Sequence, residues 1–184
     1  KQYQLLMLQL IFCQLFFNDM KIAPETMLGK ITDGLKMFLK TLTSGRISIG
    51  ALAVGTALGA YEKALQYATE REAFGKSIYK FQSIGFKLAD MATEIEAAKL
   101  MVYHAAWLKD HGEDFTKQAA MAKLFASEVA MKSTIEAIQV FGGYGYVKEN
   151  DVERFFRDAK ILEIGEGTSE IQRIIIVREI LKIF

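Results

Sequence analysis

Proline is almost absent from this chain of 184 residues, which contains one proline and one cysteine. Because proline lacks a backbone N–H and clashes with the preceding helical turn, its scarcity favours long uninterrupted helices. The single Cys13 excludes an intrachain disulfide and a cysteine-based zinc site. The only two histidines, His104 and His111, are too few for a metal site without carboxylate ligands, so we predict no metal and expect surface or packing roles for both.

The chain also has little net charge. Its 23 basic and 22 acidic residues give a formal charge of +1 at pH 7, so there is no excess positive field to favour nucleic acid or an anionic membrane surface. An apolar run at residues 4 to 17 is shorter than the roughly 20 residues that a membrane helix needs and has no small-residue cleavage site. We therefore expect neither a membrane span nor a signal peptide there.

One or two buried strands are the better interpretation of residues 4 to 17. Such strands are stable only within a larger sheet, so we expect them to belong to a β-domain that lies mostly outside this sequence. Pro24 and Gly29 then mark a connector into the first long helix. We predict residues 1 to 29 as a β-domain remnant with its connector.

Apolar residues recur at helical spacing through most of the remaining chain. A first pattern runs from Thr32 to about Glu70 and contains glycine at four interior positions, each about 1 kcal/mol less favourable than alanine in a helix. A close approach of another backbone or a ligand would explain them. These glycines are Gly45, Gly50, Gly55 and Gly59.

Two further helices follow. The second has a seam of residues three and four apart from Phe81 to Ala105, which is typical of a buried bundle face, and Gly112 ends it. Asp114 is placed to cap a third helix whose inward positions are mostly small: Ala119, Ala122, Ala126, Val129, Ala137 and Val140. Together with a last helix near the C-terminus, this predicts an all-α, up-and-down four-helix bundle over residues 30 to 184, with a short β remnant before it.

Glu166 lies between Gly165 and Gly167, immediately before the last helix. Glycines on both sides let the backbone bend sharply and approach a flat ligand. Ser169 and Gln172 have the spacing of a capping box, which predicts a helix start at about Thr168. The helix N-terminus favours a charged carboxylate, whereas burial against an apolar ligand disfavours it. Glu166 is thus either a base at the mouth of a helix or a solvated turn residue.

Over residues 15 to 184 the sequence resembles the C-terminal part of acyl-CoA dehydrogenases, most closely the short-chain (butyryl-CoA) branch. Each of the five blocks that carry the resemblance is a weak pattern, but their order and spacing together are specific. The blocks are Phe17–Lys21 with Leu28 and Gly29, Ser44–Ile47, Glu70–Lys76, Gln139–Tyr146, and Arg157–Lys160 continuing through Glu166–Arg173.

The resemblance implies an FAD enzyme that converts a short-chain acyl-CoA to the trans-2-enoyl-CoA. Glu166 matches the base that removes the α-proton while a hydride leaves the β-carbon for the flavin. Contacts to FAD are matched by Arg71, Phe74, Gln82, Thr168, Ser169 and Glu170. A segment that reaches the FAD of a neighbouring subunit is matched by Gln139, Val140, Phe141, Gly142 and Gly143. Substrate contacts are matched by Thr43, Ser44, Gly45, Arg46 and Gly167, with Arg46 the best candidate for the CoA end.

Two positions refine the resemblance. Isovaleryl- and long-chain branches place their base on the first long helix, just before the matching arginine, and this chain has Gly45 there, so the base is Glu166 or absent. Short- and medium-chain branches commonly have tyrosine where this chain has Gly165, and the glycine would widen or reshape the acyl pocket.

The family also implies partners and a location. These are an acyl-CoA substrate, electron-transfer flavoprotein and a homotetramer built as a dimer of dimers, in the cytoplasm of a bacterium or in the mitochondrial matrix. Because the N-terminal helical domain and most of the middle β-domain lie outside this sequence, we expect the chain alone to bind FAD weakly or not at all and to show no turnover. Two alternatives stay open: an acyl-CoA reductase or bifurcating enzyme, and a non-catalytic oligomerisation module.

Overall fold

The structure, a computed structural model, describes residues 16–182. The chain divides into two compact units, residues 1–40 and 41–184. In the first, the described residues before α1 (Gly34–Glu70) contain a single regular element, the short 3-10 helix η2 (Pro24–Thr26). The strands expected within residues 4 to 17 fall almost entirely outside the described residues, and the domain boundary after residue 29 remains a prediction.

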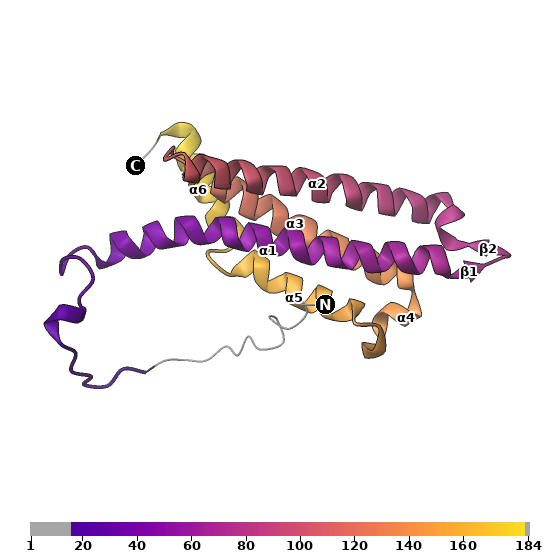
Figure 1. Ribbon diagram of the computed structural model, residues 1–184, viewed down its shortest axis with the longest axis horizontal. Helices are drawn as coiled ribbons and strands as arrows, with labels where there is room; N and C mark the ends of the chain where they lie inside the picture. Colours follow the sequence, from indigo (N-terminus) through magenta and orange to yellow (C-terminus); the bar gives the residue numbers. More distant parts are fainter. Residues whose placement is uncertain (1–15, 183–184) are drawn as a thin grey trace. The chain divides into compact units, whose positions relative to one another are not determined.

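The second unit is helical, which confirms the predicted all-α class (Figure 1). After α1 come α2 (Gln82–Asp110), α3 (Thr116–Phe141), the single turn α4 (Gly143–Tyr146), α5 (Val152–Ile164) and α6 (Ser169–Leu181). Short 3-10 turns, η3 (Ile78–Lys80) and η4 (Lys148–Asn150), precede α2 and α5. None of the described helices combines the length and the apolar character needed to cross a bilayer.

Two elements were not expected from the sequence. Strands β1 (Glu72–Ala73) and β2 (Lys76–Ser77) form a two-stranded antiparallel hairpin after α1, in which Glu72 pairs with Ser77 and Ala73 with Lys76. The segment after α4 forms the 13-residue helix α5, where no helix was predicted from the sequence. The bundle therefore has one substantial helix more than predicted.

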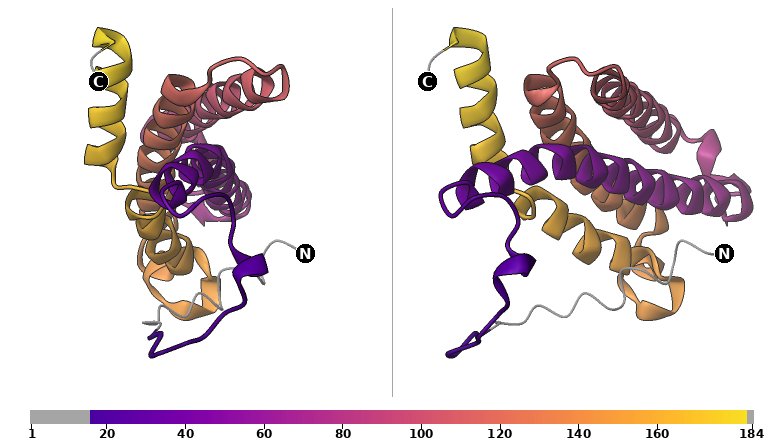
Figure 2. Two further views of the ribbon diagram at one scale, coloured as in Figure 1. Left: turned by 90° about the vertical axis from the view of Figure 1, so that its left-hand side faces the viewer. Right: turned by 60° about the vertical axis from the view of Figure 1, so that its left-hand side comes forward.

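Helix α3 is the centre of this unit, since it packs against α2, α5 and α6 (Figure 2). Its small positions are all buried, as predicted, and so is most of the α2 stripe. Small side chains let the helices approach closely, so a β-carbon added at Gly50 of α1 would lie 3.0 Å from Val102 of α2. The buried face of α1 is likewise small, with Ala53, Ala57, Ala60, Ala64 and Ala68, while its larger Leu52 and Leu65 are exposed.

The junction between α2 and α3 follows the prediction. Gly112 has φ +74°, a conformation that glycine adopts without strain, and α2 ends two residues before it. The Asp114 carboxylate accepts a hydrogen bond of 3.0 Å from the backbone N–H of Thr116, the first residue of α3. This bond lowers the pKa of Asp114, because it stabilises the charged carboxylate.

Candidate active site

The turn between α5 and α6 contains Gly165, Glu166 and Gly167 and has an unusual backbone. Gly167 has φ +94°, which requires glycine, and Glu166 itself has φ +56°. A residue with a β-carbon costs on the order of 1 to 3 kcal/mol in such a conformation, and strain of this kind concentrates at functional sites. The left-handed backbone conformation of Glu166 therefore needs contacts from the surrounding structure to stabilise it.

The side chain of Glu166 is aimed at α1. A β-carbon added at Gly45 would lie 2.5 Å from Oε2 and 2.8 Å from Cδ of Glu166, so only glycine fits beside this carboxylate. Oε2 is buried and accepts no hydrogen bond from any residue that the structure describes. Buried polar atoms are nearly always paired, so this oxygen needs an explanation such as a ligand. The residue as a whole is half-buried.

Arg46 joins the same cluster from the next position of α1. Its side chain is only 6% exposed and one of its terminal nitrogens donates a 3.3 Å hydrogen bond to Thr43 Oγ1. Burial lowers the pKa of Arg46, and the nearby Glu166 carboxylate opposes that effect. Within the described part of the chain, Arg46 Nε has no acceptor. Four predicted substrate residues, Thr43 to Arg46, thus lie on the turn of α1 that meets Glu166.

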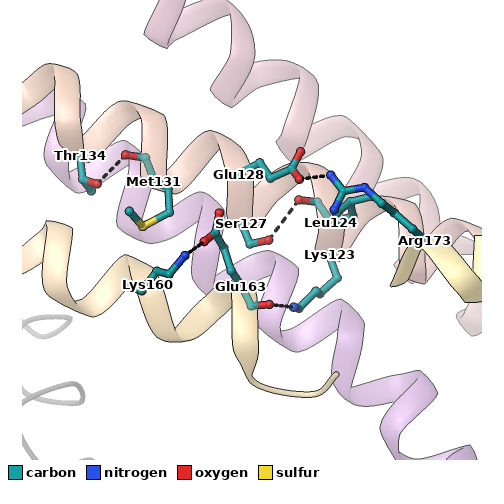
Figure 3. Close-up of polar contacts among 9 residues, drawn as sticks. All are labelled: Lys123, Leu124, Ser127, Glu128, Met131, Thr134, Lys160, Glu163 and Arg173. Carbon is teal, nitrogen blue, oxygen red and sulfur yellow. Dashed lines mark hydrogen bonds and ion pairs between the residues drawn. The ribbon is translucent and has the colours of Figure 1, made fainter. Parts of the chain in front are cut away.

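Lys123 of α3 is a member of this site that the sequence analysis missed. Its side chain is fully buried, and Nζ donates a hydrogen bond of 3.1 Å to the carbonyl of Glu163 (Figure 3). A second hydrogen bond, of 2.9 Å, goes to the carbonyl of Gly167. Burial lowers its pKa to about 8, against the attraction of Glu163, Glu170 and Glu166. A signal was present, because Lys123 follows Ala119 by four positions on the buried, alanine-rich face of α3.

The start of α6 differs in detail from the predicted capping box. The residue that caps the helix is Thr168, whose Oγ1 accepts a 3.4 Å hydrogen bond from the N–H of Ile171. The assignment of the cap to Ser169 was wrong by one position, and Gln172 instead donates from Nε2 to the carbonyls of Glu166, at 3.2 Å, and Gly167, at 2.8 Å. Gln172 reaches back over the turn because Gly167 leaves no side chain in its path.

The predicted FAD residues near this turn divide by exposure. Ser169 is buried, and its hydroxyl has no partner among the described residues. Glu170 is exposed, and hydrogen bonds from the Thr168 side chain and from a backbone N–H lower its pKa. The first turn of α6 thus has a buried hydroxyl without a partner among the described residues.

A second cluster lies around the end of α3. A hollow of about 580 Å³ is lined by residues from α1, η3, the end of α3 and the segment after it: Tyr67, Arg71, Ile78, Val140, Phe141, Gly142, Gly143, Tyr144 and Val147. Tyr67 stacks on Phe141 with ring centroids 4.1 Å apart, and the Arg71 guanidinium lies 5.7 Å from the centre of the Tyr144 ring. Five of the predicted flavin residues, Arg71 and 140–143, therefore share one surface.

The remaining predicted flavin residues lie outside this lining. Phe74, in the hairpin, is 96% exposed and meets Phe81 edge to face at 6.2 Å. Gln82, the first residue of α2, and Gln139, in the last turn of α3, are both exposed. Most of the predicted residues therefore form two clusters with no member in common, one partly buried around Glu166 and one open around Arg71, and these three residues belong to neither.

Known proteins match both the sequence and the fold. The family model for the acyl-CoA dehydrogenase C-terminal domain matches residues 32–181. A probable acyl-CoA dehydrogenase of Bacillus subtilis, YngJ, is 57% identical over 169 residues, covering 92% of this chain and 44% of that protein. Subunit CarC of the caffeyl-CoA reductase-Etf complex of Acetobacterium woodii is 45% identical over 168 residues, covering 91% of this chain and 44% of the subunit.

The structure of butyryl-CoA dehydrogenase from Megasphaera elsdenii superimposes with a TM-score of 0.89 at 50% identity, covering 90% of this chain and 43% of that one. The chain thus spans less than half the length of the relatives that it matches. Because the family model matches most of the chain and the site residues lie within the matched range, the chain belongs to the acyl-CoA dehydrogenase family and contains its C-terminal helical domain.

Proposed function

We propose that this chain supplies the catalytic base and part of the flavin site of an FAD-dependent dehydrogenase that acts on short-chain acyl-CoA. The observation that carries the proposal is the Glu166 carboxylate, which lies against Gly45 and whose Oε2 is buried and unpaired among the described residues. A buried carboxylate with a free oxygen can accept a proton from a ligand in the same space. The similarity to butyryl-CoA dehydrogenase supports the substrate class.

The chemistry requires a base because the α-hydrogen of a thioester is only weakly acidic. Glu166 would take the α-proton, so the C–H electron pair moves into the new double bond as a hydride leaves the β-carbon. Bound FAD supplies the hydride acceptor. Arg46 lies near the proposed base, and its Nε donor has no partner among the described residues. We propose that Arg46 contacts the substrate at the CoA end. The other proposed substrate contacts are Thr43, Ser44, Gly45 and Gly167.

The second cluster suits a flat, charged cofactor. Its aromatic and aliphatic walls would accept a ring system, and Arg71 would pair with a phosphate. The family segment that matches 139–143 reaches the FAD of a neighbouring subunit, and Arg71 shares its hollow, so we propose that Arg71 serves that same FAD, together with Phe74 and Gln82. The free hydroxyl of Ser169, with Thr168 and Glu170, is proposed to contact FAD at the base turn.

Assembly and partners follow from this reading. A site that borrows residues from a neighbouring subunit requires an oligomer, which we propose to be a tetramer of two dimers, with electron-transfer flavoprotein as electron acceptor. The location would be the cytoplasm in a bacterium or the mitochondrial matrix in a eukaryote. We further propose that this chain alone binds FAD weakly or not at all, and flavin absorbance after reconstitution, followed by a dye-coupled assay with butyryl-CoA, measures this.

A second candidate function has support of its own. The 45% identity to a subunit of a caffeyl-CoA reductase-Etf complex favours a reductase or bifurcating enzyme, in which the same residues work in the opposite direction. In that case Glu166 would return a proton to the α-carbon. Kinetics with a defined electron donor and an enoyl-CoA, compared with the dye-coupled oxidation of butyryl-CoA, separates the two directions.

The variant Glu166→Gln tests the proposal in the FAD-loaded, assembled protein. We expect turnover to fall by about 1,000-fold or more, because the amide cannot accept the proton, while bound FAD is retained. Glu94→Gln is the matched control, since Glu94 of α2 pairs with Lys132 of α3 and neither residue is proposed for the site. Unchanged turnover in Glu166→Gln would leave only the non-catalytic oligomerisation module.

A further inference from the structure

We propose that Lys123 and Gln172 are positioning residues that clamp the backbone of the Glu166 turn and so hold the base against Gly45. The inference rests on the proposed role of Glu166 for its catalytic consequence, but the clamp itself is a property of the described chain. Lys123 lies outside the five sequence blocks that carry the family resemblance. Gln172 lies within the last block, but no catalytic or flavin role was predicted for it.

Lys123 provides the first half of the clamp. Its Nζ donates to the carbonyl of Glu163, in the last turn of α5, and to the carbonyl of Gly167, one residue after the base. The two acceptors thus lie on either side of Glu166. Because Lys123 is fully buried and projects from the central helix α3, its ammonium is fixed relative to the bundle core.

Gln172 provides the second half from α6. Its Nε2 donates to the carbonyls of Glu166 and Gly167, and its side chain is fully buried. Three consecutive features of the turn are therefore tied by two side chains: the end of α5, the base and the glycine after it. Four hydrogen bonds to backbone carbonyls can offset the cost of the left-handed conformation of Glu166, which has φ +56°.

The charges around Lys123 explain why a lysine is tolerated in the core. The groups that face it are Glu163 of α5, Glu170 of α6, Arg46 of α1 and Glu166 of the turn, so three carboxylates offset one neighbouring cation. Burial lowers the pKa of Lys123 to about 8. The amine carries at least two N–H donors in both protonation states, so both carbonyls can stay paired on either side of that pH.

The position of the Glu166 carboxylate matters because Gly45 of α1 lies directly against it. Gly45 meets the Glu166 carboxylate with room for no β-carbon, so a turn that relaxes cannot simply move the carboxylate toward α1. Misplacement of a catalytic group by about 1 Å can cost about 100-fold in rate even when the change is remote from the reaction. Loosening the clamp should therefore lower turnover without removing any group that contacts the substrate.

The experiment compares Lys123→Met with Lys132→Met. Methionine keeps the length and apolar stem of Lys123 but donates to neither carbonyl, and Lys132 is a half-exposed lysine of the same helix that pairs with Glu94. Hydrogen exchange of the amides of residues 165–168 is measured in the chain, and kcat and KM for butyryl-CoA in the assembled, FAD-loaded protein. Circular dichroism checks the fold.

For Lys123→Met we expect exchange at residues 165–168 to rise about 10-fold or more and kcat to fall by about 10- to 100-fold, with KM changed by less than about 3-fold. Lys132→Met should change none of these. If Lys123→Met does not fold, Gln172→Leu removes the other two hydrogen bonds and takes the same measurements. Wild-type exchange and wild-type kcat in the folded variant would overturn the clamp.

The two proposals fail separately. If Glu166→Gln retains full turnover, Glu166 is not the base, yet the exchange measurement still decides whether Lys123 holds the turn. If Glu166→Gln is inactive but Lys123→Met leaves exchange and kcat unaltered, the base stands and the clamp is rejected.

Discussion

The turn around Glu166 and the hollow around Arg71 were both predicted as parts of one catalytic apparatus, but they are built in opposite ways. The turn is buried and polar, and it is held by hydrogen bonds from α3 and α6. The hollow is open, and it is lined by aromatic and glycine residues, with Tyr144 57% exposed. The proposed base is held by hydrogen bonds from its own chain, whereas the proposed flavin surface is an open hollow.

Substitutions in the two regions should have different effects. Changes near Glu166 should alter catalysis while FAD stays bound, because the affected contacts lie within one folded unit. Changes near Arg71 should alter cofactor retention first and turnover only through it. The predictions below test this division in order of decreasing effect.

Apart from replacement of Glu166 itself, the largest effect is expected from Gly45→Ala. A methyl group at this position would lie 2.5 Å from Glu166 Oε2, so the carboxylate must move. We expect turnover of the assembled protein to fall by about 100-fold or more with FAD still bound. Gly55→Ala is the matched control on the same helix, since a β-carbon there meets nothing within 4 Å, and it should raise stability by about 0.5 to 1 kcal/mol. Full activity of Gly45→Ala would show that the base does not lie where the structure places it.

Arg71→Ala should affect the other region. Loss of the guanidinium removes the only cation in the lining of the hollow, so we expect FAD to dissociate about 10-fold more readily, with the rate per bound flavin nearly unchanged. Flavin fluorescence on dilution measures the loss. Arg157→Ala removes an arginine of α5 that pairs with Glu153 on the surface and serves as control. Equal FAD retention in both variants would contradict the proposal that Arg71 contacts FAD.

The pH dependence of stability sharpens the comparison for Lys123. Burial lowers its pKa to about 8, from 10.5, so between these values the unfolded chain keeps a proton that the folded chain releases. This contribution makes the free energy of unfolding rise with pH across that window, and the penalty is fully present below pH 8. Urea unfolding of wild type and Lys123→Met at pH 7 and pH 10 measures it, and the rise attributable to Lys123 should vanish in the variant.

Lys132 is the reference for this measurement. Its hydrogen bond to Glu94 raises its pKa from the ordinary value of 10.5, so its stabilising contribution is present below pH 10.5 and is lost only as the pH rises through the raised value. Lys132→Met should therefore leave the difference in stability between pH 7 and pH 10 nearly unchanged, whereas Lys123→Met should reduce it. An equal change in both variants would contradict the burial of Lys123.

The smallest effect is expected at the surface of the same helices. Arg173 of α6 pairs with Glu128 of α3, but both side chains are about half exposed. Exposed ion pairs contribute about 0 to 1 kcal/mol, so Arg173→Gln should lower the free energy of unfolding by less than about 1 kcal/mol and leave turnover intact. A loss comparable to that of Lys123→Met would mean that the surface pair, not the buried clamp, fixes α6.

The sequence predicted the parts of this molecule whose signal is local or periodic. The stripe of α2 and the small face of α3 are visible as spacing, and Glu166 and Gly45 are visible through the resemblance. The hairpin at residues 72–77 escaped notice because each strand has only two residues, too short for alternation to show.

Tertiary contacts escaped for a different reason. Lys123 contacts carbonyls 40 and 44 residues away, and no spacing rule links a lysine to backbone acceptors at that distance. The cap was misplaced by one position because Thr168 and Ser169 are both good caps, and the choice depends on where Gln172 can reach. The sequence therefore predicted Glu166 as the candidate base, but not the hydrogen bonds from Lys123 and Gln172 that hold its turn.

The most direct test of the account is the exchange of the α-hydrogens of butyryl-CoA with D2O, followed by NMR under anaerobic conditions on the assembled, FAD-loaded protein. We predict measurable exchange in the wild type and in Glu94→Gln, and a fall of about 100-fold or more in Glu166→Gln, since no other carboxylate of the described turn faces Gly45. Exchange in Glu166→Gln at the wild-type rate would contradict the assignment of Glu166 as the group that takes the α-proton.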